Sequence, residues 1–128
     1  MEYYFEQWVS GTLEDDPLPV GVRFINFIIT EYNDRFELAF TASENPLEIS
    51  YPDMYYPLEA QCFFCDEYFK IRPHGRQIVY NITKKLILDF CAKEKNNIHF
   101  CPNGRSEFDN MTISLGFRGK KAKYLVKL

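Results

Sequence analysis

The sequence contains no hydrophobic run long enough to cross a bilayer, and its first residues lack the basic region of a secretory signal. The longest apolar stretch, residues 24–29, is interrupted by Asn26. It is far shorter than the roughly 20 residues that a membrane-spanning helix needs. We therefore expect a cytoplasmic protein without membrane association, in which the 4 cysteines are reduced.

Catalytic signatures are also absent. The sequence has no Gly-x-Ser-x-Gly, no His-Glu-x-x-His and no glycine-rich phosphate-binding or dinucleotide-binding loop, the short motifs that most directly indicate chemistry. Its 2 histidines are His74 and His99, and nothing in the sequence brings these two acid–base groups together. We expect no catalytic residue and no cofactor.

The cysteines raise the question of a zinc site. Cys62 and Cys65 form a Cys-x-x-Cys pair, and Cys91, Cys101 and His99 could complete a tetrahedral ligand set. However, two phenylalanines separate the first pair, and no second Cys-x-x-Cys follows. We interpret the cysteines as small buried core residues and expect no metal ion.

Basic residues are scarce in the first half of the chain. Residues 1–67 contain fourteen acidic residues and two basic ones, Arg23 and Arg35, whereas residues 68–128 contain thirteen basic and four acidic residues. The net charge of −3 therefore conceals two halves of opposite sign. Either the halves neutralise each other within one domain, or they leave an acidic face and a basic face.

Hydrophobic periodicity predicts both strands and helices. Residues 21–30 are apolar on both faces, which predicts a central strand, and the glycine, proline and aspartate content of residues 11–19 predicts a loop. A hairpin turn is expected at residues 31–34. The predicted elements are strands at 3–9, 21–30, 35–41 and 47–51, helices at 57–70 and 76–95, and strands at 98–101, 111–117 and 122–128.

Strands, then two helices, then strands is the order typical of an α+β protein. Because 46% of the residues are hydrophobic, the chain can bury a core. We predict a single domain over residues 1–128. Its antiparallel sheet would have about six to seven strands, with two consecutive helices packed on one face.

An acidic, tyrosine-rich surface leads to the first functional hypothesis, a non-catalytic cytosolic binding protein. Its partner would be a basic protein, as for an immunity- or antitoxin-like inhibitor that neutralises a cationic nuclease. Nucleic acid is an unfavourable partner because the pI is about 5.4, and the oligomeric state is not predicted. The expected contact residues are Glu14, Asp15, Asp16, Asp53, Tyr55 and Tyr56.

The second hypothesis places function in the basic half. Arg72 and His74 precede a predicted helix that begins at Arg76, and the amino terminus of a helix favours anions. Lysines cluster again near the carboxyl terminus, at Lys120–Lys121 and Lys123. Together these residues predict an enzyme or binding protein that acts on phosphate or nucleic acid.

Overall fold

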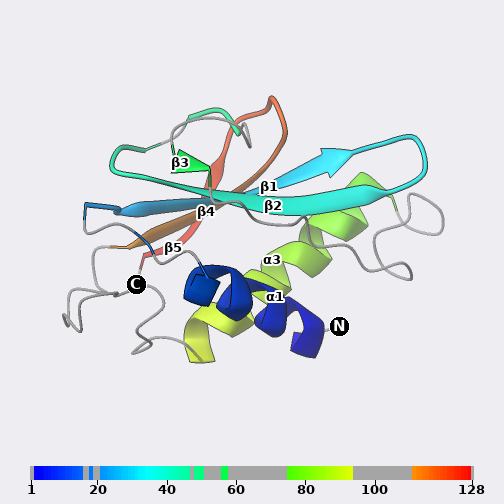
Figure 1. The fold of residues 1–128 in the computed structure, drawn as a ribbon. Helices are drawn as coiled ribbons and strands as arrows, with labels where there is room; N and C mark the ends of the chain where they lie inside the picture. Colours follow the sequence, from blue (N-terminus) through cyan, green and yellow to red (C-terminus); the bar gives the residue numbers. More distant parts are fainter. Residues whose placement is uncertain are drawn as a thin grey trace.

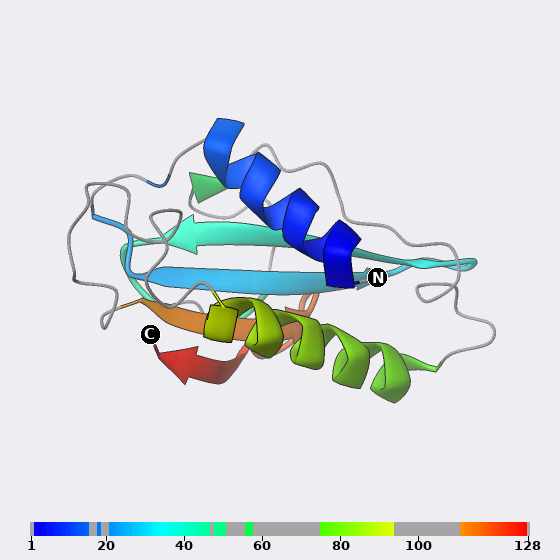
Figure 2. The ribbon, with the colours of Figure 1, turned by 90° about the horizontal axis from the view of Figure 1, so that it is seen from below.

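The computed structural model describes residues 2–15, 18, 21–46, 48–50, 56–57, 75–93 and 111–127. These residues form a mixed α+β arrangement in which two helices cover one face of a sheet (Figures 1 and 2). The helices are α1 (Glu2–Asp15) and α3 (Arg76–Lys93), and the strands are β1 (Phe24–Glu31), β2 (Phe36–Ser43), β3 (Tyr56–Pro57), β4 (Thr112–Phe117) and β5 (Lys123–Lys127).

The sheet is mixed, which corrects the prediction of an antiparallel sheet. The strand order is β3-β2-β1-β4-β5, so β1 is central as its two apolar faces predict. It pairs antiparallel with β2 but parallel with β4. The part of the chain that the structure describes has five strands in this sheet, including the two-residue β3, and not the expected six to seven.

Residues 3–9 belong to a helix, not to the predicted strand. Phe5, Val9 and Leu13 are spaced by four residues and are all buried, which is the helical period. Residues 11–15, predicted as part of a loop, continue the same helix. The apolar residues in the short window 3–9 fit both the two-residue period of a strand and the 3.6-residue period of a helix. Only when Leu13 is included does the row of apolar residues identify a helix.

The remaining predictions have mixed outcomes. Helix α3 and the closing β4–β5 hairpin are confirmed, as is the β1–β2 hairpin. Pro57 is not at a helix start but in β3, opposite Thr41. In the predicted strand 47–51, Ile49 forms only an isolated bridge with Lys121. Residues 58–70 and the predicted strand 98–101 lie outside the described residues.

The core lies between the sheet and the two helices. Helix α1 packs over β1 and β2, since the Phe5 ring lies 6.1 Å from Phe27 and the Trp8 ring 5.2 Å from Phe40. Helix α3 runs beside α1 over the β4 side (Figure 2), and Phe90 meets Phe5 edge-on at 6.0 Å. Two helices therefore cover one face, but they are not the two consecutive helices that the sequence predicted. Helix α1 replaces a predicted strand and precedes the sheet, and the remainder of the other predicted helix, residues 58–70, lies outside the described residues.

Candidate binding surface

The carboxyl ends of β1 and β4 meet at one edge of the sheet because the two strands are parallel neighbours. The backbone N–H of Arg118, just after β4, donates to the carbonyl of Ile29 in β1 at 2.8 Å. Helix α3 begins at the same edge with Arg76. Carboxyl ends of parallel strands are frequent ligand-binding positions.

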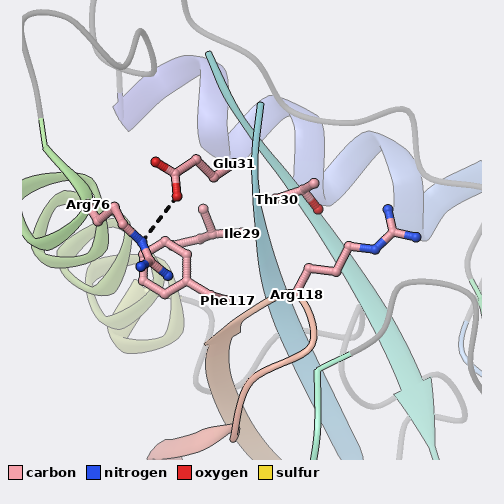
Figure 3. A pocket seen from close by; sticks show the side chains of 6 residues that line it. All are labelled: Ile29, Thr30, Glu31, Arg76, Phe117 and Arg118. Atoms are coloured by element: carbon pink, nitrogen blue, oxygen red, sulfur yellow. Dashed lines mark ion pairs between the residues drawn. The ribbon is translucent and has the colours of Figure 1, made fainter. Parts of the chain in front are cut away.

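A hollow of about 240 Å³ lies at this edge (Figure 3). Within it, Nε of Arg76 forms an ion pair with Oε1 of Glu31 at 3.2 Å. In Figure 3 the Arg118 guanidinium extends away from Arg76, on the side of Thr30. The two arginines thus do not converge on one point. The lining residues are Ile29, Thr30, Glu31, Arg76, Phe117 and Arg118.

Beside the hollow, two stacked aromatic rings lie between two cations. The Arg76 guanidinium lies 4.6 Å from the Phe117 ring centroid, and Phe117 stacks on Tyr80 at 6.0 Å and 24°. Nζ of Lys123 lies 5.7 Å from the Tyr80 ring, within the range of cation–π attraction. Burial raises the pKa of Tyr80 above its ordinary value. This stack joins α3 to β4 and β5.

The turn between β4 and β5 carries exposed positive charge. We call Arg118, Lys120 and Lys121 the basic turn; all three side chains are exposed. Gly119 between them has φ of 77°, a left-handed conformation that glycine adopts without strain. Among the described residues, no carboxylate forms an ion pair with any of the three.

A short segment, Glu48–Ser50, holds this turn in place. The Ser50 N–H donates to the Lys120 carbonyl at 2.8 Å, and the Ser50 carbonyl accepts from Gly119 at 2.7 Å. The Ala122 N–H donates to the Glu48 carbonyl at 2.8 Å. These three backbone hydrogen bonds hold the turn in place without using its charged side chains. The side chains therefore stay available to a ligand.

The Ser50 side chain enters a buried polar cluster on the sheet face away from the helices. Asn26 donates to the Ser50 hydroxyl at 3.1 Å and accepts from the Ser114 hydroxyl at 2.9 Å. Thr41 is the register partner of Asn26, and its hydroxyl is buried without a hydrogen-bond partner. The cluster anchors the segment that carries Ser50 to the centre of the sheet.

Several acidic residues of the first half, in contrast, are already paired. Lys93 of α3 contacts both Glu2 and Glu6 at 2.7 Å, which raises its pKa. Arg35 pairs with its neighbours Asp34 and Glu37 at 3.0 and 3.1 Å. The Lys93 contacts and the Arg76–Glu31 pair show that the two oppositely charged halves partly neutralise each other at the surface, whereas the Arg35 pairs lie within the acidic half.

The predicted acidic contact surface is only partly described. Glu14 and Asp15 are exposed at the end of α1. Tyr56 lies in β3, whereas Asp16, Asp53 and Tyr55 lie outside the described residues. Because only three of the six residues are described, the structure does not test whether they form one surface. A surface for a basic protein stays a prediction.

The structure describes only one of the three residues of the predicted anion site. Arg76 is the first residue of α3, while Arg72 and His74 lie outside the described part of the chain. The carboxyl-terminal lysines Lys120 and Lys121 lie on the basic turn, at the same edge of the sheet as Arg76. Sequence reasoning missed Arg118 and Glu31, whose positions depend on the parallel pairing of β1 with β4.

Cys91 is buried in α3, and burial raises the pKa of its thiol to about 12. A thiol of this kind is a core residue and a poor metal ligand. Within the described ranges no group of three or more His, Cys, Asp or Glu side chains could hold a metal ion. Cys62, Cys65, Cys101 and His99 lie outside those ranges. No helix in the described part of the chain is long and apolar enough to cross a membrane.

Comparisons with protein-family models, with curated proteins and with solved structures found no match to this chain.

Proposed function

We propose that this protein is a non-catalytic binding protein whose basic turn recognises an acidic segment of a partner protein. The observation that carries the proposal is the contrast between paired and unpaired cations. Arg35, Arg76 and Lys93 each have a carboxylate partner, whereas the described residues provide none for the basic turn. Exposed, unpaired charge held on a fixed backbone is suited to attract a partner of opposite sign.

A protein partner fits these contacts better than a nucleic acid. Binding of single-stranded nucleic acid generally uses free aromatic rings on which bases stack. The rings of Phe117 and Tyr80 are stacked on each other and on Arg76 and Lys123. This leaves Tyr124 as the one exposed ring among the described residues of β4, β5 and the basic turn, whereas successive bases need several. In addition, the net charge of −3 repels a polyanionic nucleic acid more strongly than a short acidic segment that carries fewer negative charges.

Fluorescence anisotropy with two labelled probes tests this proposal. The first is a ten-residue peptide of alternating glutamate and valine, and the second is single-stranded DNA of ten thymidines. We expect the peptide to bind more tightly than the DNA at low salt, and Lys120→Glu to weaken peptide binding by about fivefold, equivalent to ~1 kcal/mol.

Lys84→Glu provides the matched control because Lys84 is an exposed lysine on α3 and the substitution changes the charge equally. It should affect peptide binding less than Lys120→Glu. Equal effects of the two substitutions, or stronger binding of the DNA than of the peptide, would overturn the proposal.

A further inference from the structure

Strand β5 offers an open edge for an additional strand. It is the last strand in the sheet order and pairs with β4 on one side. In the part of the chain that the structure describes, no strand pairs with its outer side. Such an edge presents backbone N–H and C=O groups that an extended segment can complement.

An apolar hollow of about 380 Å³ adjoins this edge. It runs across the starts of β1 and β4 and along most of β5, because Thr112 is the register partner of both Phe24 and Lys127. Tyr124, which borders it, is 62% exposed. The hollow has room for a large apolar side chain of an added strand. Its lining residues are Phe24, Thr112, Tyr124, Leu125, Val126 and Lys127.

The positive charge around β5 favours a negatively charged occupant. Lys123 and Lys127 stand at the two ends of β5, and the basic turn precedes it. None of the described residues forms an ion pair with either lysine. Pairing with a second copy of this chain would gather four lysines along one short seam, and like charges on neighbouring strands repel. An acidic segment, in contrast, meets a lysine on each face of this edge, because the register places Lys123 on the face that α3 covers and Lys127 on the other.

We infer that the acidic partner binds by adding an extended strand to β5, with an apolar side chain in the hollow beside Tyr124 and, on the opposite face of the sheet, acidic side chains beside Lys123. The inference rests on the proposed function and specifies how the partner is held. Backbone hydrogen bonds to β5 would supply affinity, whereas the hollow and the lysines would supply specificity.

Three versions of the glutamate–valine peptide separate strand addition from simple charge attraction. One is unmodified. The other two carry N-methyl groups on alternate backbone amides, one on the odd and one on the even positions, so that each keeps the charge but lacks the hydrogen-bond donors of one edge. We expect the version whose N-methyl groups replace the hydrogen-bond donors that face β5 to bind at least tenfold more weakly than the unmodified peptide. We also expect the unmodified peptide to slow amide hydrogen exchange in residues 123–127.

Tyr124→Ala tests the hollow, with Tyr4→Ala as the matched control. Tyr4 is 65% exposed on α1, so the two substitutions remove similarly exposed rings. Tyr124→Ala should weaken binding of the unmodified peptide at least threefold, and Tyr4→Ala should leave it unchanged. Equal losses would contradict a role for the hollow.

The outcomes distinguish this inference from the proposed function. If both N-methylated peptides bind as tightly as the unmodified one, and Lys120→Glu still weakens them, the basic turn binds acidic partners but strand addition is wrong. If no peptide binds at low salt, both proposals are overturned. Peptide-independent, concentration-dependent dimerisation that protects β5 amides would identify a second copy as the occupant and contradict the inference.

Discussion

The guanidinium carbon of Arg76 lies 4.6 Å from the centroid of the Phe117 ring, which ties the first turn of α3 to the last residue of β4. Arg76 also pairs with Glu31 at the end of β1. One side chain thus connects the helix to both parallel strands, at the edge of the sheet from which the basic turn extends.

Arg76→Gln should therefore lower the free energy of unfolding by about 1 kcal/mol, because it removes both the ion pair and the cation–π contact. Arg76→Lys should lose less, since it keeps the charge. Urea denaturation measures both, with Lys84→Gln as the control on the same helix. A loss no larger in Arg76→Gln than in the control would show that the contact does not stabilise the edge.

Gly116 faces Ser50 so closely that a Cβ there would collide with the serine hydroxyl and lie 3.0 Å from the Lys121 carbonyl oxygen. Gly116→Ala should destabilise the protein by about 1–3 kcal/mol and loosen the basic turn. In α1, by contrast, nothing lies within 4 Å of a Cβ at Gly11. Gly11→Ala should stabilise the protein by about 0.5–1 kcal/mol. Thermal denaturation that moves both variants in the same direction would contradict this difference.

The Thr41 hydroxyl is buried without a partner. Thr41→Val should therefore raise the free energy of unfolding by about 1 kcal/mol, because it removes an unsatisfied polar group with little change in shape. Thr83 is also buried, but its hydroxyl donates to the Val79 carbonyl at 2.7 Å. Thr83→Val should be neutral or destabilising. Chemical denaturation should rank Thr41→Val above Thr83→Val, and the reverse order would show that Thr41 is satisfied in solution.

Burial raises the Cys91 pKa from 9.0 to about 12, so the native protein holds this proton more tightly than the unfolded chain. Well below pH 9 the thiol is neutral in both states and contributes no pH dependence. As pH rises from 9 towards 12, the unfolded thiol ionises first and stability falls. Cys91→Ala should reduce that fall. Peptide mapping after alkylation at pH 8 should find Cys91 unmodified until the protein unfolds; rapid native modification would contradict its burial.

Prediction from sequence succeeded where a hydrophobic pattern continued over many consecutive residues of one element. Helix α3 shows its apolar period over many turns, and the central position of β1 follows from its two apolar faces. The pattern of α1 was misinterpreted because residues 3–9 fit two periods, and only Leu13 extends the stripe far enough to decide.

The binding surface was harder to predict because it depends on contacts between distant residues. Arg76 and the lysines of the turn were predicted from their charge and spacing. Arg118 and Glu31 line the same hollow as Arg76 only because β1 and β4 pair in parallel, although more than 80 residues separate the first residues of the two strands. No local pattern encodes that pairing.

The most direct test of the account is to map where an acidic peptide binds, by recording amide NMR spectra of the whole chain during titration with the glutamate–valine peptide. The account predicts saturable shifts at residues 118–121 and along β5, which disappear when salt rises from about 0.02 M to about 0.5 M. Shifts confined to other parts of the chain, or shifts at the turn that persist unchanged at high salt, would contradict it.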